Sequence, residues 1–467
     1  MPKRWPSVTV AFLAALLLPG LCLAAGPATH LNSGDEAWVL ASSALVLLMT
    51  PGLALFYGGM VRGKNVITTM LQVFIIIGIV SVQWVLFGYS LAFGPDWHHV
   101  IGTLAWVGFR HVGAAPDAAY APTIPNQLFA IFQLMFAVIT PALIVGGFAE
   151  RMRFKAVLIF TVLWATIVYD PLAHWVWGAG GWLHQMGVLD FAGGTVVHIS
   201  SGVAGLVTAI LLGKRKGLGH DEHIRAHNVP MVLIGTALLW FGWFGFNAGS
   251  ALAANPLAVS AFLVTNTATA AASVTWVVVE WWRTGKPTLI GACAGAVSGL
   301  VAITPASGFV GPLGSIVIGI GAGVICYLGA SVLKNRLGYD DALDAFGGHG
   351  LGGTWGAIAT GLFAEVAVNS AGANGLLYGN PKQLLLQVVG VLAAWIFSAV
   401  GTYVVFKVTD VLVGCRVTPE EEEQGLDAVP HGEAAYPEQM TVDSIQEWVG
   451  HDQADPAVPL VKGGASA

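Results

Sequence analysis

The chain has 467 residues, of which 55% are hydrophobic and 10% are charged, and its mean hydropathy is +0.72. Soluble domains carry roughly 25% charged residues, so this composition excludes an ordinary soluble protein and indicates one that crosses a membrane many times. The formal net charge of −6 says little about partners, because much of the acid lies near the C-terminus.

Residues 1–25 are predicted to be a secretory signal peptide. Lys3 and Arg4 form a basic start, an apolar run continues to Leu23, and the small residues Ala24 and Ala25 follow. The alternative is an uncleaved first helix. The four cysteines have neither the spacing of a disulfide framework nor that of a zinc site.

Eleven apolar runs after this leader are long enough to span a bilayer, and they predict an all-α polytopic membrane domain over residues 35–411. The runs are 37–58, 67–93, 127–149, 154–176, 193–213, 229–250, 259–282, 288–304, 308–333, 346–365 and 385–411. Residues 412–467 form an acidic tail, too short for an appended enzyme domain, which we expect to be partly disordered.

The basic residues predict the orientation of these spans. One set of alternate loops holds thirteen basic residues, and the opposite set holds only Arg110 and Lys382. Because positive charge is retained on the cytoplasmic side, the mature N-terminus is expected outside and the tail inside the cell. The localisation expected for the chain is the inner (cytoplasmic) membrane.

Two stretches in the fifth and tenth runs share one pattern. Asp190 stands eight residues before His198, and Asp341 stands eight residues before His349. Glycines follow each histidine at i+4 and i+7, and they are Gly202, Gly205, Gly353 and Gly356. These glycines allow helices to approach closely, and a histidine within a membrane marks a candidate functional site.

The matching contexts predict two five-helix repeats of opposite orientation, followed by a final helix. Eight residues of α-helix descend about 12 Å, so both histidines would reach the centre of a hydrocarbon core about 30 Å thick. The aspartates are expected to cap their helices, with Asp344 as an alternative cap to Asp341. Asp190, on the outer side, is also placed to favour a cation.

His198 and His349 have no accompanying carboxylate at ligand spacing, and a metal site needs three or four ligands. We therefore expect no metal and no other cofactor. Two facing imidazoles without a metal can share a proton, which suits a small substrate that exchanges protons.

Aromatic residues gather in the outer half of the predicted membrane domain. Phe132 and Phe136 lie four residues apart on one helical face, Trp177 ends the fourth run, and Phe246 and Ser250 end the sixth. Such residues often form only an interfacial belt. If they converge, however, the rings and the hydroxyl form a cation–π cage for a small ammonium-type cation.

At these residues the chain resembles the ammonium transporter (Amt/Mep/Rh) family, and specifically its bacterial Amt branch. The resemblance covers residues 35–436 and includes five segments as well as parts of the tail. They are Phe56-Tyr-Gly-Gly-Met-Val-Arg-Gly-Lys-Asn65, Ala149-Glu-Arg151, Asp190-Phe-Ala-Gly-Gly-Thr-Val-Val-His198, Trp243-Phe-Gly-Phe-Asn-Ala-Gly-Ser250 and Phe346-Gly-Gly-His349-Gly.

The resemblance implies a homotrimer with one pore in each eleven-helix subunit. It implies an outer ammonium site of Phe132, Phe136, Trp177 and Ser250, and a stacked gate of Phe136 and Phe246. His198 and His349 match the family's pore histidines, and Asp190 matches an aspartate needed near the outer site. A PII-type signal protein is the implied partner at the cytoplasmic face.

We therefore expect a transporter and not an enzyme, acting on ammonium and ammonia in a lipid bilayer and having no nucleic-acid partner. It would bind ammonium outside, remove a proton, and conduct ammonia past the histidines while the proton is relayed separately. An intact cation is costly to carry between apolar walls, whereas neutral ammonia is not. The alternatives are an ammonium sensor that signals through its cytoplasmic face and, more distantly, a membrane metalloenzyme.

Overall fold

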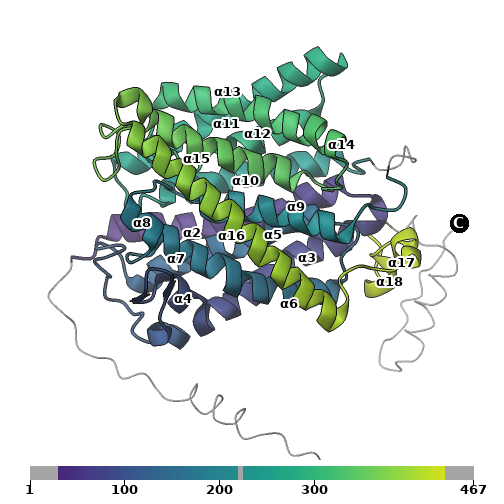
Figure 1. Cartoon of the computed structure of the whole chain (residues 1–467), viewed down its shortest axis with the longest axis horizontal. Coiled ribbons are helices and arrows are strands. Elements are labelled where there is room, and N and C mark those ends of the chain that lie inside the picture. Colours follow the sequence, from purple (N-terminus) through teal and green to yellow (C-terminus); the bar gives the residue numbers. More distant parts are fainter. Residues whose placement is uncertain (1–29, 219–224, 437–467) are drawn as a thin grey trace, which may run out of the picture.

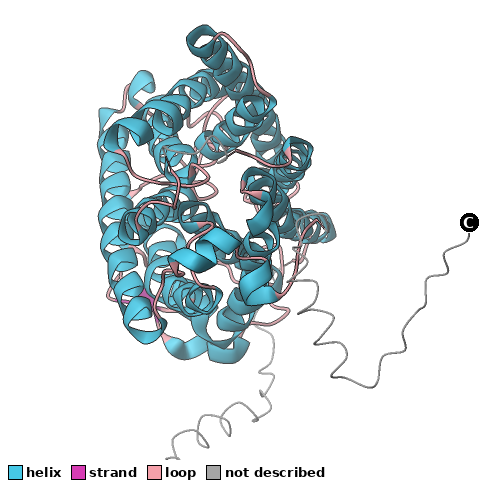
Figure 2. Ribbon diagram, turned by 90° about the vertical axis from the view of Figure 1, so that its right-hand side faces the viewer, coloured by secondary structure: helices cyan, strands magenta, loops and turns pink. Residues whose placement is uncertain are grey.

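The computed structural model describes residues 30–218 and 225–436. The predicted signal peptide at 1–25 and the last part of the tail, 437–467, lie outside the described residues. Long helices lie side by side along the length of the molecule (Figure 1). Figure 2, turned by 90°, views many of these helices end on.

The long apolar helices dominate the described chain. They are α2 (Ser33–Met60), α3 (Val66–Gln83), α5 (Asn126–Phe148), α6 (Phe154–Trp164), α9 (Ser200–Leu212), α10 (Val229–Gly249), α11 (Pro256–Thr284), α12 (Leu289–Ile303), α13 (Pro312–Leu328), α15 (Leu351–Phe363) and α16 (Pro381–Val413). Shorter helices are α4 (Tyr89–Phe93), α7 (Asp170–Trp177), α8 (Trp182–Met186), α14 (Lys334–Leu337), α17 (Pro419–Gln424) and α18 (Ala428–His431). The two short antiparallel strands β1 (Asp96–Trp97) and β2 (Ile101–Gly102) are an exception to the all-α prediction.

Among the described residues, nine helical segments are long and apolar enough to cross a membrane. The expected run 288–304 corresponds to the shorter apolar helix α12, and the run 346–365 corresponds to the π-helical turn η7 (Phe346–Gly350) continued by α15. The chain is thus a multi-pass membrane protein. The number of eleven spans and the inverted repeats stay predictions.

Five π-helical turns lie within or at the start of apolar helical segments of the described chain. They are η2 (Trp84–Gly88), η4 (Ala165–Tyr169), η5 (Gly194–Ile199), η6 (Gly329–Leu333) and η7. A π-turn inserts one residue into the helical repeat and so redirects the side chains beside it, which is why such turns are frequent at functional sites. His198 lies in η5, and His349 lies in η7.

Glycines allow the backbones around the histidines to touch, as the sequence predicted. A Cβ atom added to Gly202 would lie 2.1 Å from the backbone nitrogen of Gly350, and one added to Gly356 would lie 2.2 Å from the Ala302 carbonyl oxygen. Neither position has space for a side chain. These contacts bring α9 directly against η7 and α15 against α12.

The tail is ordered as far as it is described. The acidic run 420–423 lies in α17, where Thr418 and Glu421 form a capping box. The Lys64 ammonium donates to the Glu422 carbonyl at 3.0 Å, and the Asp427 carboxylate accepts from the Thr68 backbone at 2.8 Å. The tail helices α17 and α18 therefore lie against the start of α3, at the right-hand end of the molecule in Figure 1.

Candidate functional site

The two histidines meet in the interior, although 151 residues separate them in the chain. η5 carries His198 and η7 carries His349, and their Nδ1 atoms are 3.3 Å apart. The ring centroids are 5.3 Å apart, and only 1% and 5% of the two residues are exposed. Since each neutral imidazole has one N–H, this contact needs a donor on one ring and an acceptor on the other.

Asp190 and Asp341 cap the turns η5 and η7, as the sequence predicted. Asp190 accepts from the backbone nitrogens of Gly193, Gly194 and Thr195, each at 2.7 Å. Asp341 accepts in the same way from Ala345 at 3.1 Å and from Phe346 at 2.7 Å. The two turns are therefore fixed by the same device.

Two details of the capping prediction were left open or wrong. Asp344, the alternative cap, has a φ of 58° and pairs with Lys334, so Asp341 is the cap. A regular helix does not begin at either aspartate, because Gly193 has a φ of 121° and each first turn is a π-turn. The 12 Å descent estimated for regular α-helix consequently does not apply.

A small cavity of about 10 Å³ lies beside the histidine pair. Apart from the two histidines its lining is apolar and aromatic, and consists of Met49, Leu53, Ile139, Leu143, Val197, Leu239, Trp243, Phe246 and Val297. That volume accommodates roughly one water-sized molecule. The His198 ring stacks on Trp243 and Phe246 at centroid distances of 5.3 and 6.0 Å, and its Nε2 atom has no hydrogen-bond partner.

A larger cavity of about 210 Å³, here called the vestibule, contains three of the four predicted cage residues. Its lining consists of Phe93, Ala119, Tyr120, Phe129, Gln133, Phe136, Trp177, His184, Phe191, Ser250 and Leu252. The fourth cage residue, Phe132, lies beside Phe136 with a centroid distance of 5.0 Å and does not line the vestibule. The Trp177 indole N–H donates to the Asp190 carbonyl at 2.9 Å, which joins the vestibule to the capped turn.

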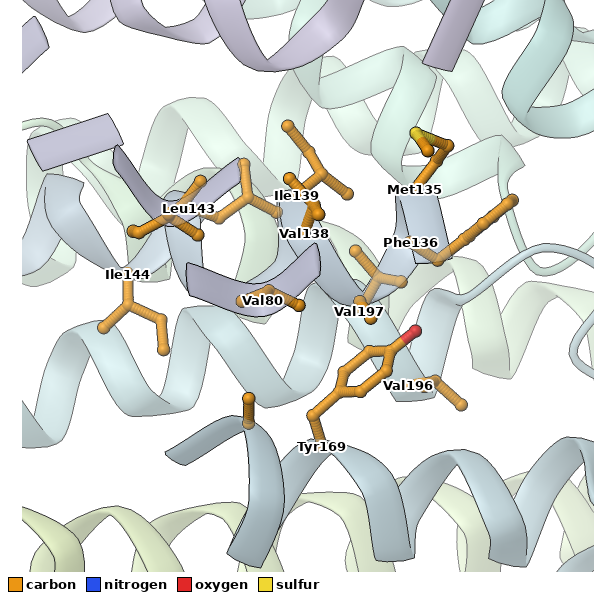
Figure 3. Packing of buried hydrophobic residues seen from close by; sticks show 14 of the residues in the cluster. Val80, Met135, Phe136, Val138, Ile139, Leu143, Ile144, Tyr169, Val196 and Val197 are labelled. Atoms are coloured by element: carbon orange, nitrogen blue, oxygen red, sulfur yellow. The ribbon is translucent and has the colours of Figure 1, made fainter. Parts of the chain in front are cut away.

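Two phenyl rings separate the vestibule from the small cavity. Phe136 lines the vestibule, Phe246 lines the small cavity, and their ring centroids are 4.3 Å apart. Figure 3 shows Phe136 with Val196 and Val197 of η5 among tightly packed buried side chains. The contact between these two rings therefore lies where the linings of the two cavities meet.

A buried network of ion pairs lies at the opposite end, near the tail helices. Arg215 pairs with Glu150 at 3.0 Å and with Asp340 at 2.8 Å, and Arg62 also pairs with Glu150 at 3.0 Å. Burial acts to raise the pKa of Glu150, but Arg215 and Arg62 outweigh it and lower that pKa to about 2. The network joins four connecting segments that are distant in sequence.

Sequence reasoning named some of the residues that line each cavity, among them His198 and His349 in one and Phe136, Trp177 and Ser250 in the other, but it missed two features. Trp243 was treated only as part of an aromatic run, and the basic residues of the network only as markers of orientation. The segment Ala149-Glu-Arg151 was the available signal, because an acid at the end of an apolar helix needs a partner. Within residues 30–218 and 225–436, no group of three or more His, Cys, Asp or Glu side chains is arranged to hold a metal ion.

The chain is similar to known proteins in both sequence and structure. Residues 37–436 match the family model described as Ammonium Transporter Family. An ammonium transporter of Bacillus subtilis is 55% identical over 410 residues, covering 88% of this chain and all of the relative. The crystal structure of Saccharomyces cerevisiae Mep2 has a TM-score of 0.79 and 38% identity, covering 84% of this chain and 89% of that one. A solved structure titled Sensor Amt Protein has a TM-score of 0.77 and 30% identity, covering 85% and 98%.

Proposed function

The chain belongs to the ammonium transporter family, and we propose that it takes up ammonium by binding the cation in the vestibule and conducting ammonia past His198 and His349. The observation that carries the proposal is the arrangement of two cavities around one aromatic pair. A wide, aromatic vestibule is followed by a space for one small molecule beside a hydrogen-bonded histidine pair.

The vestibule has the chemistry to select a small cation. Trp177 and Phe136 both line the vestibule and stand nearly perpendicular to each other, with centroids 5.9 Å apart. A cation held in the vestibule against the face of either ring would gain a cation–π contact. The Ser250 hydroxyl donates its proton to the Phe246 carbonyl at 2.8 Å. Its oxygen lone pairs remain available to accept an N–H of ammonium.

Deprotonation is proposed to occur near Asp190, before the substrate passes Phe136 and Phe246. The Asp190 carboxylate is occupied by backbone donors, so it would act by favouring a cation nearby and by holding η5. The small cavity would admit one neutral ammonia molecule without its hydration shell. Carrying the intact cation through the same apolar lining would cost several kcal/mol of desolvation free energy.

The histidine pair offers ammonia one acceptor and one donor. If the Nδ1 of one ring donates to the other, the donor ring has a bare Nε2 and the acceptor ring has a protonated Nε2. When the bare Nε2 takes up a proton, the Nδ1 proton of that ring can pass to the Nδ1 of the second ring, and the second ring can release the proton on its Nε2. The two rings have then exchanged their roles, and one proton has moved from one side of the pair to the other. We propose that this exchange relays the separated proton along the pore.

The wider assembly is part of the proposal. The thirteen basic residues in alternate loops support a cytoplasmic tail, and the matching caps at Asp190 and Asp341 support two inverted five-helix repeats within eleven spans. Residues 35–411 would form the membrane domain and 412–467 the tail. We propose a homotrimer in the inner (cytoplasmic) membrane, with a PII-type protein at the tail face.

Ammonium-evoked current across proteoliposomes tests the transport proposal. A pulse of external ammonium should drive an inward current, because net charge enters with each separated proton. Ammonia flux without current would refute the electrogenic mechanism and leave a gas channel. Absence of both, in correctly folded protein, would refute transport.

Variants of the histidines test the relay. In the doubly substituted His198→Ala, His349→Ala protein, the current should no longer depend on deprotonation, and selectivity against potassium should fall if water fills the widened pore. The single changes His198→Asp and His349→Glu keep a group that can carry a proton and should retain part of the current. Wild-type current and selectivity in a well-folded double-alanine protein would contradict the relay.

The second candidate is an ammonium sensor, favoured by the likeness to the solved sensor protein and by the ordered contacts of α17 and α18. Deletion of residues 437–467 separates the two, with growth on limiting ammonium and the cellular nitrogen response as the measurements. Loss of signalling without a growth defect would support the sensor. A growth defect with intact signalling would support the transporter.

A further inference from the structure

His174 lies on α7, one helical turn before Trp177, and its buried ring contacts two oxygen atoms. Its Nδ1 atom is 2.9 Å from the backbone carbonyl oxygen of Ala92, at the end of α4. Its Nε2 atom is 2.8 Å from the Oδ1 atom of Asp96, in β1. The His174 ring has no exposed surface, so water does not replace either partner.

The two partners determine where the protons are. A backbone carbonyl oxygen only accepts hydrogen bonds, and so does an ionised carboxylate. Both ring nitrogens must therefore carry a proton. We propose that His174 is a buried imidazolium ion whose pairing with Asp96 positions Trp177 in the vestibule, an inference that rests on the proposed ammonium site.

The opposite assignment, a neutral ring facing a protonated Asp96, does not fit the surroundings of that carboxyl group. Asp96 has 25% of its side chain exposed to solvent, and its second oxygen accepts from the His99 backbone at 3.2 Å. Burial acts to raise the pKa of Asp96, but the hydrogen bonds from His174 and His99 outweigh it, and the pKa lies below its ordinary value. An ionised Asp96 requires the proton on His174.

Few other titratable groups are close to this pair. The His99 ring faces Asp96 from the β1–β2 turn, with its Nδ1 atom 3.4 Å from the carboxylate. Asp170 lies one turn earlier on α7 and accepts from Gln83 of α3 at 2.7 Å. Tyr120 donates its hydroxyl proton to the Phe93 carbonyl at 2.8 Å. Asp96 is consequently the direct counter-ion of His174.

The pair connects two walls of the vestibule. Ala92 directly precedes Phe93, and His174 is followed one turn later by Trp177, and both of these aromatic residues line the vestibule. The bonds of a single ring thus tie the end of α4 to the last turn of α7.

The β1–β2 turn is held against the same helices by further contacts. The Trp175 indole donates to the Val100 carbonyl at 2.7 Å, and the His99 ring bonds the Gly180 carbonyl at 2.7 Å. Only the His174–Asp96 contact in this group pairs a buried ring with a carboxylate, so removing that hydrogen-bonded contact should shift Trp177 without unfolding the turn.

Solid-state ¹⁵N NMR of histidine-labelled protein in lipid tests the protonation state directly. The difference between wild-type and His174→Gln spectra at neutral pH should contain two protonated ring nitrogens. A bare imine nitrogen in that difference would overturn the proposal. This measurement does not involve transport, so it stands even if the proposed function fails.

Two substitutions of similar size at Asp96 test the positioning role. Asp96→Asn can donate its amide N–H to a neutral His174 Nε2, so both hydrogen bonds and the apparent ammonium affinity should survive, while the NMR signal becomes that of a neutral ring. Asp96→Leu removes the partner and should weaken the apparent affinity by about two- to thirtyfold, the range of a misplaced cation–π contact. Maximal current should change little.

A matched control lies in the same turn. His98→Asn changes a neighbouring histidine whose φ of 55° asparagine tolerates. Apart from the loss of its own ring signals, this change should leave the His174 signals and the affinity unchanged. Equal affinity in folded Asp96→Leu and wild-type protein would overturn the positioning role. Equal loss in Asp96→Asn and Asp96→Leu would also overturn it, because restored hydrogen bonds would then have no effect.

Discussion

Gly202→Ala should separate the two histidines without touching either of them. The added Cβ atom would lie 2.1 Å from the Gly350 nitrogen, whereas ordinary contacts begin at 3.4 Å. The backbones of α9 and η7 must therefore move apart by about 1.3 Å, the difference between these two distances. Neither atom belongs to a flexible side chain, so the strain cannot be relieved by a rotamer change.

The separation should break the contact between the rings. Adding about 1.3 Å to the 3.3 Å between the Nδ1 atoms gives about 4.6 Å, which is beyond hydrogen-bond range. Overpacking of this kind costs about 1–3 kcal/mol of stability. If the proton passes between these nitrogens, the ammonium-evoked current should fall by at least about tenfold, which corresponds to about 1.4 kcal/mol of barrier.

The assay is current in proteoliposomes, with thermal unfolding of the purified protein as the measure of stability. Gly348→Ala is the matched control, because it lies in the same turn as His349 and its added Cβ meets nothing within 4 Å. The control should keep wild-type current. The reasoning is refuted if Gly202→Ala folds normally and conducts as well as Gly348→Ala.

Three further predictions concern the vestibule, the ion network and the tail. Trp177→Leu keeps apolar bulk but removes a cation–π face worth about 0.5–2 kcal/mol, so the apparent ammonium affinity should weaken several-fold. An unchanged affinity would mean that Trp177 belongs only to the interfacial aromatic belt. Because the folded-state pKa of Glu150 is depressed from 4.5 to about 2, its contribution of about 3 kcal/mol is complete above pH 4.5 and is lost as the pH falls toward 2. Acid-unfolding curves of Glu150→Gln should lose that part of the pH dependence, and a curve parallel to the wild type would contradict the assignment. Asp427→Ala removes the acceptor of the Ile67 and Thr68 backbone N–H groups and should lower the free energy of unfolding by about 1 kcal/mol. The tail should then be cleaved faster in limited proteolysis. A tail as protected as in the wild type would show that other contacts hold it.

Local chemistry explains why much of the site was predictable from the sequence. Histidines and aspartates are rare in apolar helices because lipid cannot solvate them, so His198, His349 and Asp190 stood out from their surroundings. The capping role of Asp190 was readable for the same reason, because a carboxylate a few residues before a helix can accept from its first N–H groups. Phe136 and Trp177 were found as members of aromatic clusters.

Other features depended on contacts between distant segments. The division of the interior into two cavities depends on the contact between the tilted rings of Phe136 and Phe246, which joins α5 and α10. Phe132 has the aromatic side chain expected of a cage residue, yet it packs beside Phe136 and does not line the vestibule. Nothing in the local sequence distinguishes these two phenylalanines.

The sequence by itself determined which residues could do the chemistry, because burying a polar side chain in lipid is costly wherever it lies in the chain. Only the tertiary structure decided which of them meet. His198 and His349 approach because Gly202 leaves room for the Gly350 backbone, and His174 is charged because Ala92 and Asp96 both offer it acceptors. Contact and protonation state depend on neighbours supplied by other helices, which a pattern along one helix does not contain.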